Sequence, residues 1–130
     1  MTFRGKLSEV LSQLLKIALQ LVRDYPRAGG NWCQELTAVN GRARFRTCIV
    51  SNKGLTPFWL WTCDASTNPD KSTLAPLYVP AATTQSISLE ASPVLFSNGI
   101  YVCASTDPVT KTLLGTNDAF FTVVYDTTIF

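Results

Sequence analysis

Two periods of hydrophobic residues follow one another along the chain. From residue 7 to residue 22 the apolar residues recur at helical spacing, and after Gly30 apolar and polar residues alternate. On a helical wheel the first set spans about 200°, twice the stripe of an ordinary surface helix. The pattern predicts an amphipathic helix over residues 4–23 that is buried on more than one side. Pro26 and two glycines in "DYPRAGG" then predict a helix stop and a flexible joint.

The change of period predicts three parts. Residues 1–25 form an N-terminal amphipathic helical arm, residues 26–30 a Gly-containing linker, and residues 31–130 a β-sandwich domain. We expect the arm to dock against another chain through the centre of its apolar arc, at Leu7, Leu11, Leu14, Ala18 and Leu21. The alternative is that the helix packs across its own β domain. A role at a membrane surface is not expected, because the polar face carries few cations.

Alternation with a period of two predicts strands after the glycines. "CQELTAV" and "ARFRTCIVSN" are joined by Asn-Gly, the strongest short signal for a β-hairpin. "TPFWLWTCDA" is apolar on both faces, which predicts a strand in the middle of a packed sheet. In the run that begins at Ala43, the expected faces are Ala43, Phe45, Thr47 and Ile49 on one side and Arg44, Arg46 and Cys48 on the other.

The rest of the chain continues with short strands and turns. "STNPDKST" predicts a loop, the proline-flanked "LAPLYVPA" an edge strand, "TQSISLE" a short strand and "SPVLFSNG" a turn. Residues 97–126 then read as a strand, a polar loop and a second strand, which we interpret as a closing hairpin. The fold class expected is mainly β, an antiparallel β-sandwich or jelly roll with an N-terminal amphipathic α-helical arm.

Composition limits the partners. Hydrophobic residues make up 46% of the chain and charged residues 15%, so we expect much of the surface to be covered by other chains. The net charge of +2 is too small to indicate nucleic acid or an anionic membrane. Arg42, Arg44 and Arg46 lie on one face of an extended strand and could meet carboxylates of a neighbouring subunit or track phosphates. The alternative is a solvated face, or pairing with acids such as Glu35.

Catalytic and metal-binding residues are scarce. The chain has no histidine, the commonest general base and transition-metal ligand, and its acids show no informative spacing. We therefore expect no enzymatic activity and no cofactor or metal. Among the cysteines, Cys48, Cys63 and Cys103 lie in apolar or β-branched runs and no pair has zinc-site spacing, which predicts buried free thiols. With no signal segment recognised at the start, we expect folding in a cytosol.

Two stretches resemble a known group of proteins. "LFSNGIYVCAST", a polar loop and "NDAFFTVVYD" resemble the end of small β-sandwich virion proteins of tailed bacteriophages, in which an "f.nGi.va.St" strand precedes a closing "d..vtv.Y" strand. "RFRTCIVSNKGLTPFWLWTCDAST" is similar to the first half of that pattern. The resemblance covers residues 36–126 and implies a capsid-bound, head-to-tail or tail-bound structural protein, often oligomeric. It carries no active-site residues and does not include the arm.

The expected function is that of a phage virion structural protein of the capsid decoration or cement type. Its partners would be itself, as a homo-oligomer for which a trimer is plausible, and other virion proteins, with no nucleic acid and no membrane. It would reside in the virion after assembly in the host cytoplasm. The alternative is a tail- or fibre-associated adhesin that contacts a host glycan through residues 64–73 or 105–117. Low charge and the broad apolar helix favour the first function.

Overall fold

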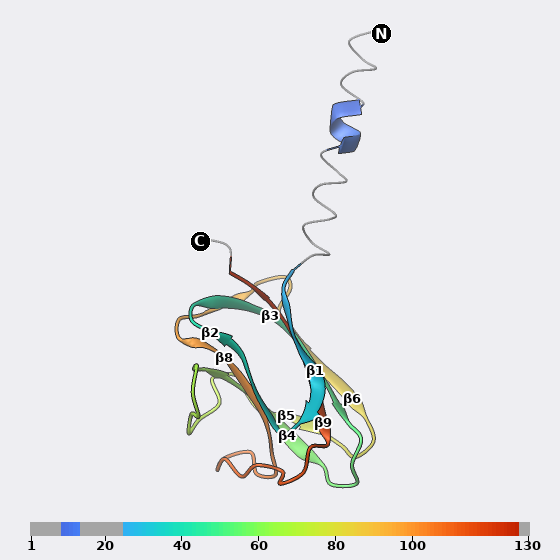
Figure 1. Ribbon diagram of the computed structural model, residues 1–130, viewed down its shortest axis with the longest axis vertical. Helices are drawn as coiled ribbons and strands as arrows, with labels where there is room; N and C mark the ends of the chain where they lie inside the picture. Colours follow the sequence, from blue (N-terminus) through green and yellow to red (C-terminus); the bar gives the residue numbers. More distant parts are fainter. Residues whose placement is uncertain (1–8, 14–24, 128–130) are drawn as a thin grey trace.

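The computed structural model describes residues 9–13 and 25–127, and the β-strands of this part form two antiparallel sheets (Figure 1). Sheet I has the strand order β1-β9-β3-β6, with β7 also paired to β3, and sheet II has the order β2-β8-β4-β5. The expected mainly β sandwich is confirmed at this level. The strands are β1 (Arg27–Cys33), β2 (Glu35–Asn40), β3 (Ala43–Asn52), β4 (Phe58–Asp64), β5 (Leu77–Val79), β6 (Thr84–Ser88), β7 (Val94–Phe96), β8 (Gly99–Ser105) and β9 (Ala119–Asp126).

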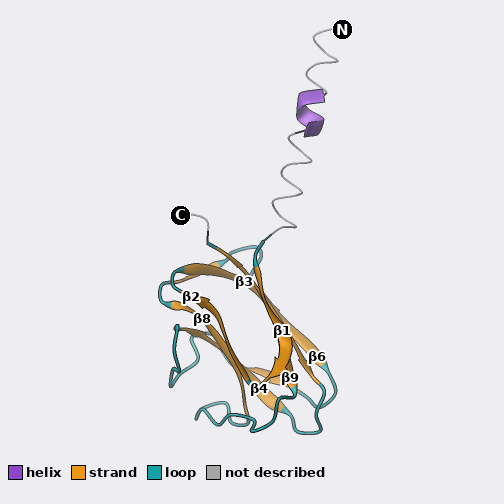
Figure 2. Cartoon of the chain, viewed as in Figure 1, coloured by secondary structure: helices purple, strands orange, loops and turns teal. Residues whose placement is uncertain are grey.

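The chain alternates between the two sheets as it proceeds. β1 and β3 belong to sheet I, whereas β2 and β4 belong to sheet II, and the last two strands again divide, β8 in sheet II and β9 in sheet I. As a result β1 pairs with β9 and β2 pairs with β8, so the first strands lie beside the last ones. Figure 2 shows the strands in two facing layers.

Both sequence-predicted hairpins are wrong. The Asn40-Gly41 turn joins β2 to β3, which lie in different sheets, and the loop after Ser105 joins β8 to β9, which also lie in different sheets. Gly41 does adopt the positive φ, +119°, that its turn requires, and its amide donates to the carbonyl of Asn98 at 3.2 Å. Turn chemistry thus reverses the chain locally, but the choice of pairing partner depends on which neighbours bury the apolar faces.

The core lies between the sheets. Strands β3, β4, β8 and β9 supply most of its fully buried side chains. Phe45 of β3 and Phe96 of β7 stack with ring centroids 5.6 Å apart. Burial of each large apolar side chain stabilises the fold by roughly 1.5–3 kcal/mol. Because the core cluster contains residues of both sheets, its packing holds the two sheets together.

Strand β3 changes face part-way along its length. Ala43 and Phe45 point into the core, but the register with β9 shifts between Phe45 and Thr47. Beyond the shift Cys48 is buried while Thr47 and Ile49 lie on the outer face. The prediction that Thr47 and Ile49 share a face with Phe45 is therefore wrong. A bulge inserts one extra residue, Arg46, and reverses the alternation that follows it.

Strand β4 agrees with the sequence prediction of a central strand. It lies between β8 and β5, and its two faces are both buried. Phe58 and Leu60 pack in the core between the sheets, whereas Trp61 and Cys63 pack on the outer face of sheet II. One face of β4 is thus apolar because it lines the core between the sheets, and the other because it packs in a second cluster on the outer face of sheet II.

The N-terminal region is described over a short length. Residues 9–13 are helical and lie within the range 4–23 predicted for the amphipathic helix. The rest of that range lies outside the described residues. Strand β1 begins at Arg27 and contains Gly29 and Gly30, which have positive φ values of +140° and +113°. Gly29 pairs with Thr122 of β9, and Gly30 lies in the register shift that follows it. The glycines for which the sequence predicts a joint are therefore part of a sheet, and the division into arm, linker and domain stays a prediction.

Candidate interaction surfaces

The middle of the outer face of sheet II is covered by loops of the same chain. Trp61 and Cys63 of β4 and Tyr101 and Cys103 of β8 form a second buried cluster there. Ala65 and Leu113, from the loops that follow β4 and β8, pack against this cluster. These two loops also meet through a hydrogen bond from the ammonium of Lys111 to the side-chain oxygen of Asn68. The centre of this face is therefore closed to partners.

The titratable side chains of this cluster stay protonated and contribute to the fold by packing. Burial raises the pKa of Cys63 to about 11 and that of Cys103 to about 12. Burial, together with the hydrogen bond that its hydroxyl donates to Glu35, also raises the pKa of Tyr101. Thiols with such pKa values stay protonated and unreactive at neutral pH.

The prediction of free, buried cysteines is confirmed for three positions. All four cysteines are free thiols, of which Cys48, Cys63 and Cys103 are buried and Cys33 is partly buried. Within residues 9–13 and 25–127, no group of three potential ligands could hold a metal ion. In the same part of the chain, no helix is both long enough and apolar enough to cross a membrane.

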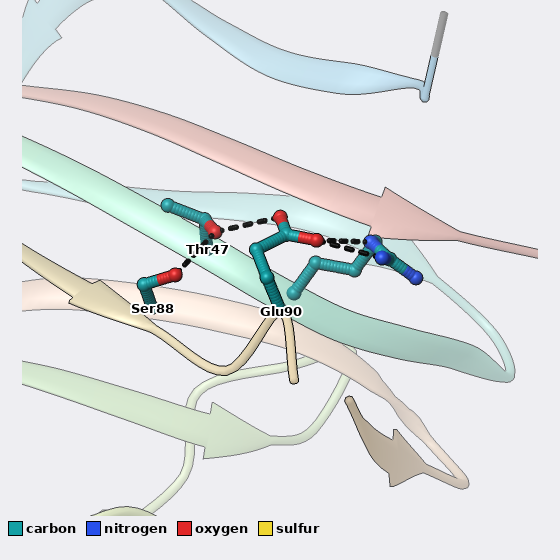
Figure 3. A network of polar contacts seen from close by, with 4 residues as sticks. Thr47, Ser88 and Glu90 are labelled. Atoms are coloured by element: carbon teal, nitrogen blue, oxygen red, sulfur yellow. Dashed lines mark hydrogen bonds and ion pairs between the residues drawn. The ribbon is translucent and has the colours of Figure 1, made fainter. Parts of the chain in front are cut away.

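Arg46 is held in a polar network on the outer face of sheet I. Its Nε and one terminal guanidinium nitrogen donate to one carboxylate oxygen of Glu90, at 2.8 and 2.6 Å (Figure 3). The hydroxyl of Thr47 donates to the other carboxylate oxygen at 2.9 Å, and Ser88 lies 3.4 Å from the same hydroxyl. The Arg46 guanidinium also lies over the ring of Tyr25, 3.9 Å from its centroid. The positive charge of Arg46 thus interacts with Glu90 and Tyr25 of the same chain.

The other predicted interface residues are distributed as follows. Arg44 lies on β3 directly opposite Asp126 of β9, the arrangement in which opposite charges attract across strands. Arg42 is exposed and precedes β3, so it does not share a strand face with the other two. Glu35, the acid named as a possible partner, accepts a hydrogen bond from the hydroxyl of Tyr101.

Of the apolar residues predicted on the arm, the structure describes one. Leu11 lies in the helical turn 9–13 and its exposed fraction is 58%. The remaining predicted contacts, Leu7, Leu14, Ala18 and Leu21, lie outside the described residues. Their role in an interface stays a prediction.

The outer face of sheet I differs from that of sheet II, and sequence reasoning missed it. Ile49 and Trp32 are 42% and 41% exposed there. Hydroxyl side chains line the strands beside them, and Ser51 lies 2.9 Å from Thr84 across β3 and β6. The reversal of β3 at its bulge brings Thr47, Ile49 and Ser51 to this face. A pure alternation rule places these residues in the core.

Comparisons with known proteins give one similar structure. No family model matches the chain, and no curated protein matches it. Among solved structures, the chain is similar to the coat protein of Tobacco streak virus, with a TM-score of 0.45 and 8% sequence identity, over 82% of this chain and 90% of that one. At this TM-score the likeness carries no conclusion about function.

Proposed function

We propose that this chain is a structural subunit of a virus particle and that its sandwich is a jelly roll. The strand order carries this proposal. In β1-β9-β3-β6 facing β2-β8-β4-β5, the two ends of the chain run side by side and the middle strands flank them, as in two interleaved Greek keys. Jelly rolls of this kind occur in viral capsid proteins, lectins and cupins. The absence of histidine from the sequence speaks against a metal-dependent member.

The finer proposal is a decoration or cement subunit of a bacteriophage particle, without enzymatic activity. It is supported by the resemblance of residues 97–126 to phage virion proteins. The two strands in that stretch, β8 and β9, lie inside their sheets, so the resemblance concerns the framework of the fold. A low content of charged residues, 15%, and the exposed Leu11 support binding through self-association and the arm.

The adhesin has less support. It requires exposed aromatic side chains in residues 64–73 or 105–117, because sugars stack on aromatic rings, and neither segment contains one. Trp61, which lies beneath these loops, is 1% exposed. We therefore favour assembly over glycan binding.

The experiment is a comparison of two substitutions in the described helical turn. We expect the purified full-length chain to sediment as a homo-oligomer and Leu11→Asp to sediment as a smaller assembly, because a carboxylate would enter an apolar contact without a partner. Gln13→Asp, which adds the same charge at a polar position two residues away, should keep the oligomer. A chain that sediments as a monomer at every concentration, or that tolerates both substitutions equally, would contradict self-association through the arm.

A further inference from the structure

The strand orders of the two sheets end in four edge strands, β1, β6, β2 and β5. Three of these strands are blunted, which means that they carry features that prevent pairing with a further strand. β1 and β2 each carry a register shift, between Gly29 and Trp32 and between Thr37 and Val39. β5 has three residues and runs between Pro76 and Pro80. Bulges, prolines and short length are the devices by which proteins prevent one sheet edge from joining another. The fourth of these strands, β6, has none of them.

Strand β6 is regular over its whole length. It pairs with β3 from Thr84 to Ser88 without a register shift, and it contains neither proline nor a charged residue. It is the last strand in the order of sheet I, so within the described part of the chain no strand pairs with its other side. Such an edge is open to another strand.

The direction of the free backbone groups follows from two hydrogen bonds that flank β6. The amide of Asn52 donates to Thr83 at 2.8 Å, and the amide of Leu89 donates to Arg46 at 2.7 Å. Bonded and non-bonded pairs alternate along an antiparallel ladder, so Gln85 and Ile87 are the β6 residues that bond β3. The N–H and C=O groups of Thr84, Ser86 and Ser88 consequently point toward the open edge.

The sequence of this edge is complementary to itself. If a second β6 runs antiparallel about a two-fold axis at Ser86, then Ser86 faces Ser86 and Thr84 faces Ser88, with two backbone hydrogen bonds at each pair. The side chains of Thr84, Ser86 and Ser88 are exposed on the outer face, so hydroxyls meet hydroxyls and no like charges oppose. Ser51 and Thr84 already form a hydroxyl pair of this kind across β3 and β6.

We propose that β6 joins two copies of this chain by antiparallel edge pairing about a two-fold axis through Ser86, which extends sheet I across both subunits. The partner is a second copy because the edge matches its own reverse, as an isologous interface requires. This inference rests on the self-association in the proposed function and adds to the arm a second surface that contributes to it. Pairing with a strand of another protein is the competing outcome that the test separates.

The test uses charge at the proposed axis. In the full-length chain, Ser86→Lys and Ser86→Glu each place two like charges against each other, and we expect either to weaken dimerisation at least ~10-fold in sedimentation equilibrium. An equimolar mixture of the two variants should recover dimers, because opposite charges then meet. Thr37→Lys adds the same charge at an exposed position of the blunted edge β2 and should have no effect.

A cross-link gives a second readout. Cα atoms of a bonded antiparallel pair lie about 5.5 Å apart, within the range that a disulfide spans, so Ser86→Cys should yield a covalent dimer on oxidation and Thr37→Cys should not. Unchanged oligomers in Ser86→Lys would overturn the β6 interface and leave self-association intact. Loss of association without recovery in the mixture or a cross-link would also overturn it, since β6 would then face a different strand. A chain that is monomeric before any substitution contradicts both proposals.

Discussion

Alanine at either of two neighbouring glycines tests whether residues 29 and 30 belong to a strand or to a flexible joint. Gly29 and Gly30 both have positive φ, at +140° and +113°. A Cβ atom at Gly29 would lie 2.0 Å from the backbone oxygen of Phe121 in β9, whereas one at Gly30 meets nothing within 4 Å. The two substitutions thus share the backbone strain and differ in the clash. A joint in solvent would tolerate both.

The size of the difference follows from these contacts. Positive φ costs a residue with a side chain about 1–2 kcal/mol. Alanine also restricts the unfolded chain, which returns about 0.4–1 kcal/mol, so Gly30→Ala should lower the free energy of unfolding by about 1 kcal/mol. At Gly29 the carbonyl that is struck belongs to an inner strand, and overpacking of this kind adds about 1–3 kcal/mol. We expect a total loss of about 2–4 kcal/mol for Gly29→Ala.

Urea unfolding followed by tryptophan fluorescence measures both variants. The chain has three tryptophans, of which Trp32 lies on β1 with its ring 5.3 Å from that of Phe120 in β9, so the emission includes a contribution from separation of β1 from β9. We expect the midpoint to fall clearly for Gly29→Ala and slightly for Gly30→Ala. Equal midpoints for the two variants and the unmodified chain would refute the β1 assignment and restore the linker.

Two further predictions concern buried groups. Asn52→Ala should lower the free energy of unfolding by about 1–3 kcal/mol. The side-chain nitrogen of Asn52 donates to the carbonyl of Thr56 at 2.9 Å, and its side-chain oxygen accepts from the amide of Gly54 at 2.9 Å, so both bonds would be lost. Thermal unfolding measures the change, with Ser51→Ala, which removes an exposed pair of hydroxyls, as the control. Burial raises the pKa of Cys48 from 9.0 to about 12, so the folded state holds its proton more tightly. The contribution of this thiol to the free energy of unfolding should be fully present below pH 9 and should be lost as the pH rises toward 12. A urea midpoint that is constant across this range would contradict the burial of Cys48.

The sequence predicts strands better than it predicts their partners. The segment "TPFWLWTCDA" is recognisable as a central strand because both of its faces are apolar, and β4 is one. The Asn40-Gly41 turn is recognisable as a reversal, yet the strands on either side of it join different sheets. Pairing depends on contacts between segments far apart in the chain, such as β1 with β9, and local turn residues carry no information about them.

The candidate surfaces depend on the same long-range contacts. Arg46 is recognisable as an interface candidate from its spacing, but its partner Glu90 is 44 residues away in the sequence and lies beside it because β6 pairs with β3. The bulge beside Arg46 has no glycine or proline to signal it. An alternation rule therefore assigns Ile49 to the core, although its side chain is exposed.

The outer surfaces of the two sheets differ, and this difference supports the proposed interface at β6. The loops after β4 and β8 cover the middle of the outer face of sheet II, and both of its edge strands are blunted. Sheet I has an uncovered outer face, a regular edge at β6, and the network in which Arg46 contacts both Tyr25 and Glu90. Because Tyr25 closely precedes β1, the chain leaves the sandwich toward its N-terminus beside sheet I. A subunit that associates through β6 would therefore place Tyr25 of both copies beside the same extended sheet.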